Sequence, residues 1–303
     1  MWNRPFEKQS GAALITALMM MALCSVLAVF LLLGQRLLIQ QVTLANTSDR
    51  LTLTLQEVQN WGMGVLKQGK DIRKIRAYHV NDNGIHVSGM IYALGGRLNV
   101  NGLQDTENIP LLAALLQHVT KMADQHQAQH IAMQIARWMV PSNQTDKYYL
   151  AQRPPYRAAS QPLLFLSELR LIKGMTAPLY AALVSEKQPY LVALPTNTMQ
   201  IDVNYASVPV LMSVLNISEA EAQSIVSCRH HSELFTSVSD FMKQCGINRL
   251  LDLHHLTTTN SYYLITGVAQ QNEQRLLMQS FVQINSVDNK LAATLLWQEY
   301  NGE

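Results

Sequence analysis

The sequence predicts an α+β protein: a long N-terminal helix precedes an antiparallel sheet, and a large helical region is inserted between the strands of that sheet. An apolar run at residues 12–33 is followed, without a proline, by an amphipathic helical pattern that reaches residue 66. Strand patterns occur at residues 75–94 and again at residues 261–300, on either side of a mostly helical middle. Two separate sheets of this size would be only marginally stable, which favours one sheet with an insertion.

Composition excludes several classes of protein. The 303 residues carry a formal net charge of +2 and are 48% apolar, which excludes a disordered chain. A dedicated nucleic-acid binder would carry a basic excess, so we expect no nucleic-acid partner. Three cysteines are too few for a disulfide scaffold, and a single apolar run excludes a polytopic membrane protein.

The apolar run is long enough to cross a membrane. No charged residue lies between Lys8 and Arg36. A helix over residues 12–33 spans roughly 33 Å, against a hydrocarbon core of about 30 Å. A signal peptide has a shorter apolar region followed by a small-residue cleavage site, which is missing here. We therefore predict a transmembrane helix at residues 12–34.

The helix is expected to continue past the membrane as an amphipathic segment from Leu37 to Leu66, within a single N-terminal helix over residues 12–70. The spacing of five apolar residues, Leu44, Leu51, Leu55, Val58 and Val65, places them on one helix face. A cluster of glycines, Gly62, Gly64 and Gly69, predicts the end of the helix.

Local signals place the shorter elements. Asn83-Gly84 between two β-branched and aromatic runs predicts a hairpin, and residues 261–300 read as an antiparallel meander. Helical spacing predicts helices within residues 110–140, and two short helices broken at Gly174. Two further helix starts are predicted by Ser218 with Glu221 and by Ser237 with Asp240.

The N-terminus resembles a type IV prepilin signal, because a short basic leader ends at Gly11 and the apolar run begins at Ala12. The resemblance implies a leader at residues 1–11, cleavage by a prepilin peptidase between Gly11 and Ala12, and N-methylation of Ala12. The family's fifth mature residue is usually Glu, whereas here it is Thr16. In the family this Glu is thought to neutralise the amino terminus of a neighbouring subunit, and an unpaired Glu in the membrane is costly. A subunit without it fits a position that has no such neighbour, as at the tip of a filament.

Four phrases extend the resemblance over nearly the whole chain: GGRLNVNGL (95–103), RPPYRAASQPLLFLSELRLIKGM (153–175), ALPTNTMQIDVNYASVPVL (193–211) and FTSVSDF (235–241). They are similar to the minor pseudopilin K family of the type II secretion system, also called general secretion pathway protein K. The resemblance implies that the long N-terminal helix packs on a pilin-type sheet formed by residues 71–102 and 259–303. It also implies two SAM-like helical units, at residues 103–198 and 199–258.

The function implied by this resemblance is structural rather than enzymatic. Such a protein would be anchored by one helix in the inner membrane, with its folded part in the periplasm. It would sit at the tip of the pseudopilus, initiate assembly and support protein export across the outer membrane. Its implied partners are other minor pseudopilins, the major pseudopilin and the prepilin peptidase, and exported proteins are a further candidate. The alternative is a membrane-tethered periplasmic enzyme with an unrecognised site in the helical domain.

No cofactor is expected, and calcium is the one candidate metal. Relatives bind calcium through an acidic loop after a Trp, and the matching stretch here offers only Asn143 and Asp146. Calcium needs six to eight oxygen ligands, so this site looks depleted. His126 and His130 are four apart on a predicted helix but lack the Glu of an H-E-x-x-H motif. Solvated helix surface is the simpler interpretation.

Cys228 and Cys245 lie 17 residues apart, in the region that the resemblance assigns to the oxidising periplasm. We favour a disulfide between them over two buried free thiols. Cys24 lies within the apolar run and is expected to act as a small apolar residue.

Overall fold

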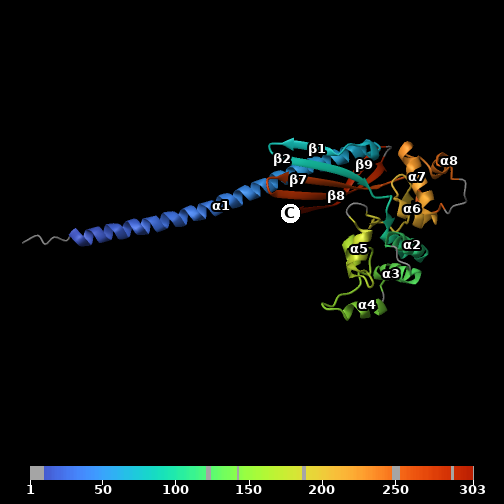
Figure 1. Ribbon diagram of the computed structural model, residues 1–303, viewed down its shortest axis with the longest axis horizontal. Coiled ribbons are helices and arrows are strands. Elements are labelled where there is room, and N and C mark those ends of the chain that lie inside the picture. The colour runs from blue at the N-terminus through green and yellow to red at the C-terminus, as the bar shows by residue number, and fades with distance from the viewer. Residues whose placement is uncertain are drawn as a thin grey trace, which may run out of the picture.

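The computed structural model describes residues 10–120, 124–141, 143–185, 189–247, 253–287 and 290–302, apart from the side chains at 10–13, 37, 143–146 and 287. A single long helix projects to one side, a sheet lies along its C-terminal half, and a helical insertion occupies the far end (Figure 1). This arrangement confirms the predicted α+β fold with its inserted helical domain.

The N-terminal helix α1 spans Ser10–Lys67 without interruption. Gly62 and Gly64 lie inside it, and Gly69, with a φ of +63°, follows its end. The glycine cluster therefore marks the end of the helix only through its last member. Gly62 is retained inside because a Cβ there would lie 2.7 Å from the Cδ1 atom of Ile265.

Five antiparallel strands form the sheet in the order β1-β2-β7-β8-β9. Their bounds are β1 Tyr78–Asp82, β2 Ile85–Ala93, β7 Tyr262–Gln271, β8 Gln274–Val287 and β9 Lys290–Gly302. Asn83 and Gly84, both with positive φ, form the predicted β1–β2 turn. The chain leaves the sheet after β2 and returns at β7, so the insertion separates two neighbouring strands.

Helix α1 covers one face of the sheet through its C-terminal half. Leu51, Leu55 and Val58 are buried there against Ile265 and Met278 of the sheet. The predicted helix face is correct for these three residues. Toward the two ends of the segment burial is incomplete: Leu44 is 54% exposed, and Val65 is half-buried next to the buried Leu66. The sheet does not reach back as far as Leu44.

The first part of the insertion runs from β3 to β4. Its elements are β3 Leu98–Asn99, η2 Val100–Gln104, η3 Thr106–Asn108, α2 Ile109–Thr120, α3 Gln125–Trp138, α4 Asn143–Leu150, η4 Leu166–Leu171, α5 Ala177–Leu183 and β4 Leu191–Val192. Strands β3 and β4 pair in parallel and so close this part on itself. The sequence predicted the helices on either side of Gly174, but neither the short strand pair nor α4.

The second part of the insertion runs from β5 to β6 and repeats this plan. Its elements are β5 Ile201–Asp202, α6 Val208–Leu215, α7 Glu219–His231, α8 Val238–Gln244 and β6 Leu256–Thr257, and β5 pairs in parallel with β6. Ser218 and Glu221 form the predicted capping box of α7, and Ser237 caps α8.

Buried side chains of the two parts form one continuous core that extends from Leu98 to Leu256. A separate core lies between α1 and the sheet. The division of the insertion into units at residues 103–198 and 199–258 stays a prediction, because no break in the core marks that boundary.

Candidate assembly site

The N-terminal part of α1 presents an apolar surface that nothing in the folded body covers. Every described side chain from Leu14 to Arg36 is exposed, and the large apolar ones between Leu14 and Leu33 are 52–75% accessible. Among the described residues, α1 is the one helix long and apolar enough to cross a membrane. Such a surface is unfavourable in water and calls for lipid or for other apolar helices.

The residues predicted for processing lie at the tip of this helix. Gly11 and Ala12 are in the first turn of α1, and Thr16 follows one turn later. The backbone is helical throughout this stretch, so the Gly11–Ala12 bond is at the far end of the molecule from the insertion (Figure 1). Thr16 is itself exposed, as expected for a residue on the apolar segment.

The other half of α1 is seated closely on the sheet by two facing glycines. Gly89 of β2 and Gly267 of β7 are register partners. A Cβ on Gly267 would lie 2.8 Å from the Cδ2 atom of Leu55, and one on Gly89 would collide with Val58. Real Cβ contacts are not this short, so the missing side chains let α1 approach the strands. The sheet and the helix are thereby fixed as one body.

The end of α1 is tied to the insertion through η1 (Ile72–Lys74). The Arg73 guanidinium pairs with Asp71 at 2.9 Å and donates a hydrogen bond to the backbone carbonyl of Arg229, at 3.3 Å. Arg229 lies at the C-terminal end of α7, where carbonyl groups accept favourably from a cation. The helix that bears the apolar surface is thus linked directly to the second part of the insertion.

A buried charged group lies behind this link. The Arg229 guanidinium donates to the carbonyls of Val203 and Ala206, at 3.0 and 2.7 Å. Asp202 is 1% exposed and accepts a hydrogen bond from the Asn204 N–H at 2.9 Å. Burial raises the pKa of Asp202 to about 6, although that hydrogen bond and the positive charges of Arg229 and Arg73 oppose the rise. Burial likewise lowers the pKa of Arg229.

Close backbone packing completes the junction between the sheet and the insertion. Gly95 and Gly96 follow β2, and a Cβ at Gly96 would overlap the backbone of Tyr205. The Gly95 N–H donates to the side-chain oxygen of Asn260 at 2.8 Å, and its carbonyl accepts from the Asp202 N–H at 2.8 Å. These contacts give a structural reason for the Gly-Gly that opens the first similar phrase.

The same phrase contributes buried asparagines that connect distant loops. The Asn101 side chain bonds both the N–H and the carbonyl of Leu163, at 2.8 and 2.9 Å. Its amide also donates to the carbonyl of Leu194, at 2.8 Å. One side chain therefore joins three of the four phrases that carry the resemblance. This bridging role of Asn101 was not predicted from the sequence, although a polar asparagine within an apolar run indicates a buried side chain that needs hydrogen-bond partners.

Cys228 and Cys245 are joined by a disulfide in the structure, with their Cα atoms 5.7 Å apart. The bond connects α7 to the residue that ends α8, so it closes the second part of the insertion. Cys24 is a free thiol on the exposed apolar part of α1.

The calcium candidates lie on a helix instead of the acidic loop expected from the resemblance. Asn143 and Asp146 are both in α4, and the description does not extend to their side chains. Asp146 is the one acidic residue in the stretch that follows Trp138 up to Leu150. This donor set does not fit a site that needs six to eight oxygens. Within the described residues, no group of three or more His, Cys, Asp or Glu is placed to hold a metal.

The histidine pairs do not form a site either. The Nε2 atom of His130 contacts the side-chain amide of Gln134 at 3.3 Å, one turn along α3, whereas His126 lies in the first turn of that helix. His254 and His255 meet edge to face, with ring centroids 5.1 Å apart, and the Nδ1 atom of His255 is 3.0 Å from the Met199 carbonyl. These contacts are those of structural or surface histidines.

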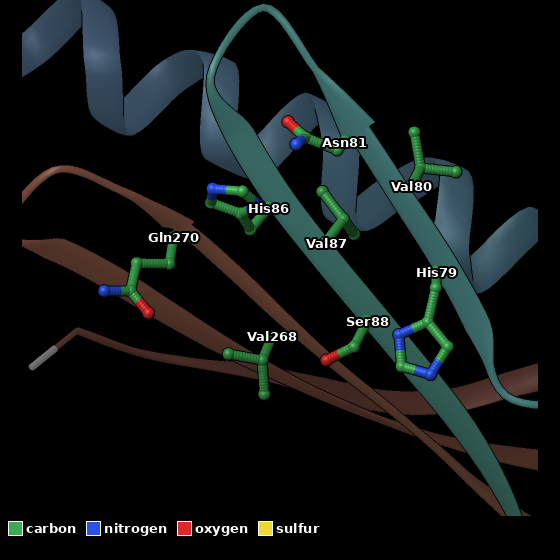
Figure 2. A pocket seen from close by; sticks show the side chains of 8 residues that line it. All are labelled: His79, Val80, Asn81, His86, Val87, Ser88, Val268 and Gln270. Atoms are coloured by element: carbon green, nitrogen blue, oxygen red, sulfur yellow. The ribbon is translucent and has the colours of Figure 1, made fainter.

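A shallow pocket of about 540 Å³ lies on the face of the sheet away from α1, near the β1–β2 hairpin. Figure 2 shows His79 beside Ser88 on adjacent strands, with His86 farther along β2. The other lining residues are Val80, Asn81, Val87, Val268 and Gln270. Its lining includes no carboxylate that could orient a histidine, so it lacks the third member of a nucleophile–base–acid arrangement.

Two family models match the insertion. The model described as "Type II secretion system (T2SS), protein K" matches residues 96–196, and the model of the helix-hairpin-helix motif matches residues 196–250. The second match agrees with the α6–α7 pair, in which Asn216 has a left-handed backbone conformation between the two helices.

Curated relatives of this chain are also named type II secretion system protein K. The chain is 26% identical to type II secretion system protein K of Pseudomonas aeruginosa, over 89% of this chain and 87% of that protein. It is 29% identical to the Klebsiella pneumoniae protein of that name, over 44% of this chain and 43% of that one.

The fold is also that of a solved structure. A chain in the crystal structure of the GspK-GspI-GspJ complex from enterotoxigenic Escherichia coli matches with a TM-score of 0.73 and 18% identity. The match covers 86% of this chain and 99% of that one. The family model and the curated relatives therefore confirm the resemblance to the protein K family of the type II secretion system, and the solved structure shows the same fold.

Proposed function

We propose that this chain is a minor pseudopilin that initiates assembly at the tip of the periplasmic pseudopilus and so supports protein export across the outer membrane. The observation that carries the proposal is the division of α1. One half presents an uncovered apolar surface, and the other half is fixed to a sheet that bears a bulky insertion at its far end (Figure 1). A subunit of this shape can pack against helices below it, while the insertion leaves little room for a subunit above.

The absence of a carboxylate at the fifth mature position supports the tip position. Thr16 stands where a Glu would serve a neighbouring amino terminus. In the apolar environment of a membrane an unpaired carboxylate is costly, so a subunit with no neighbour to serve gains by lacking one.

The proposed localisation is the inner membrane, with a single pass and the folded part in the periplasm. The single apolar helix supports one pass, and the Cys228–Cys245 disulfide supports an oxidising compartment. The proposed partners are the other minor pseudopilins, the major pseudopilin and the prepilin peptidase. The relative in the solved complex supports the first of these, since its structure is that of a GspK-GspI-GspJ complex.

Mass spectrometry of the membrane-extracted protein, with and without a prepilin peptidase, tests the route. We expect a mature chain that starts at Ala12 and carries an N-methyl group. A Gly11→Leu variant should remain uncut. A Thr16→Glu variant should still be cut, and its place in the filament is tested in a separate experiment. A chain that starts well beyond Leu33 would contradict the proposal, because it would leave a soluble protein without the apolar segment of α1.

No specific observation favours the enzyme alternative. The pocket of Figure 2 is open and lies on the sheet rather than in the helical domain, where that alternative placed its site.

A further inference from the structure

The outer end of the insertion carries a concentration of positive charge that plays no part in the proposed packing of α1. We call it the distal basic patch, and it is built around α4, which lies at the outer end of the insertion, far from α1 (Figure 1). Its six cations are all exposed: Arg137, Lys147, Arg153, Arg157, Arg170 and Lys173. They come from three stretches within residues 137–173, and contacts between these stretches bring them side by side.

Packed aromatic rings hold these stretches side by side. Tyr149 contacts Trp138 and Tyr156, with ring centroids 5.0 and 5.3 Å apart. The Tyr156 hydroxyl donates to the Leu171 carbonyl at 2.8 Å, and the Tyr149 hydroxyl accepts from the Lys173 N–H at 3.3 Å. The patch is thus built on a fixed base.

Two of the cations are themselves held in place on rings. The Arg170 guanidinium lies 4.3 Å from the centroid of the Tyr180 ring, and the Lys173 ammonium lies 4.7 Å from that of Tyr148. Cation–π contacts of this kind leave the charge available to a second partner while reducing the freedom of the side chain.

Few acidic groups offset this charge. From Arg137 to Lys173 the sequence has six basic and two acidic residues, Asp146 and Glu168. The Glu168 carboxylate already accepts the N–H groups of Leu164 and Phe165, at 2.8 and 3.1 Å. Neither of the ion pairs in the described part of the chain involves a patch residue.

Large apolar side chains are exposed among the cations. Val140, Leu150 and Leu171 are 46–48% accessible, and Tyr148 is 39% accessible. Arginine and aromatic side chains beside apolar area are typical of the central part of protein–protein interfaces. A surface that served only for solubility would not need this apolar content.

We propose that the distal basic patch docks an acidic protein surface, whose carboxylates pair with the cations and whose apolar side chains cover Leu150 and Leu171. Charge complementarity and the exposed apolar area together favour a protein over other polyanions. The chain is near neutral overall and residues 201–258 have three basic and six acidic residues, which disfavours a long nucleic acid. The patch lies far from the membrane half of α1, which disfavours the lipid of the same membrane (Figure 1).

Fluorescence anisotropy on the full chain in neutral detergent tests the proposal. The probe is a fluorescein-labelled amphipathic 20-residue peptide of Glu and Leu, compared with its scrambled form. The variant R153E/R157E/K173E should bind the peptide at least about tenfold more weakly than the wild type. Its charge-neutral counterpart R153Q/R157Q/K173Q should show a smaller loss in the same direction.

A matched control variant reverses the charge of three cations that lie outside the patch. Lys70, Arg76 and Lys243 are exposed cations outside the patch, and K70E/R76E/K243E should bind as the wild type does. Circular dichroism confirms that each variant is folded. Equal losses in both triple variants, or no binding by the wild type, would overturn the proposal. Tighter binding to phosphatidylglycerol vesicles or to a 20-nucleotide single strand would overturn the assignment to a protein. None of these outcomes depends on the cleavage at Gly11 that tests the proposed function.

Discussion

The first and second parts of the insertion begin with matching pentapeptides, LNVNG at residues 98–102 and IDVNY at residues 201–205. In both, the first two residues form a parallel strand pair with the strand that closes the part. In both, the side-chain oxygen of the second residue accepts the N–H of the fourth, at 3.2 Å in the first part and 2.9 Å in the second.

The asparagine at the fourth position makes the same set of hydrogen bonds in both parts. Asn101 bonds the N–H and carbonyl of Leu163, and Asn204 bonds the N–H and carbonyl of Phe235, at 2.8 and 3.2 Å. Each side chain also donates to a carbonyl just beyond the closing strand, that of Leu194 or Thr258. In both parts, therefore, a side-chain amide pairs with backbone groups as a neighbouring strand would, and so holds the shared arrangement together.

The second position is where the two parts differ. Asn99 donates to the carbonyls of Thr196 and Thr198, at 2.7 and 3.1 Å, whereas its counterpart Asp202 carries a carboxyl that faces Arg229 and Arg73. Arg229 belongs to α7 of the second part, and Arg73 is supplied by η1, which follows α1 and contacts the Arg229 carbonyl. The two parts of the insertion thus share one backbone arrangement, and a single difference, the amide of Asn99 against the carboxyl of Asp202, fits each part to the groups around it.

Placing the acid in the first part should have the largest effect. Asn99→Asp would set a buried carboxylate against the two threonine carbonyls and remove both donated hydrogen bonds. We expect the free energy of unfolding at pH 7 to fall by about 4 kcal/mol, measured by denaturant titration. Asn197→Asp, at an exposed position in the same loop, is the control. A loss no greater than that of the control would show that the two second positions are interchangeable.

Removing the disulfide should affect the second part alone. A Cys228→Ser/Cys245→Ser variant frees a loop with a sequence separation of 17, which costs about 3 kcal/mol in the chain-entropy model. Hydrogen exchange should increase in α7 and α8 and stay unchanged in α3. Equal increases in both parts would mean that the insertion unfolds as one unit, as its continuous core permits. Cys24→Ser, outside the insertion, should leave both parts unchanged.

The reverse exchange should stabilise the protein at neutral pH. The pKa of Asp202 is about 6 in the folded chain against an ordinary value of 3.8, so folding favours its neutral form. The favourable contribution is fully present below pH 3.8 and is lost as the pH rises to about 6. Asp202→Asn should therefore be more stable than the wild type by roughly 2–3 kcal/mol at pH 7.5, and of similar stability near pH 4.

Unfolding titrations of both proteins at several pH values measure this difference. If the difference did not grow between pH 4 and pH 6, the carboxyl would be stabilised by the two arginines rather than disfavoured by burial. Asp240→Asn, which removes an exposed carboxyl of α8 in the same part, serves as the control.

Sequence patterns sufficed where a local signal decides the structure. The Asn83-Gly84 turn, the Ser218 and Ser237 caps and the long helix all follow from residues close in the chain. The strand pairs β3–β4 and β5–β6 could not be predicted, because two-residue strands have no periodicity and their partners lie 55 or more residues away. The distal basic patch was missed for the same reason, since three separate stretches form it. The link from Arg73 to Arg229 joins residues 156 apart and left no local signal.

The smallest effect is expected from the surface contact beside that link. Lys74 pairs with Glu233 at 3.2 Å, but the two side chains are 62% and 92% exposed, so water screens the pair. Glu233→Gln should change the free energy of unfolding by less than about 0.5 kcal/mol. Arg73→Gln, which removes both the hydrogen bond to the Arg229 carbonyl and the ion pair with Asp71, should cost at least about 1 kcal/mol. Denaturant titrations of the two variants measure the two losses in the free energy of unfolding. If Glu233→Gln cost more than Arg73→Gln, the exposed Lys74–Glu233 pair, rather than the contacts of Arg73, would hold the second part of the insertion to η1.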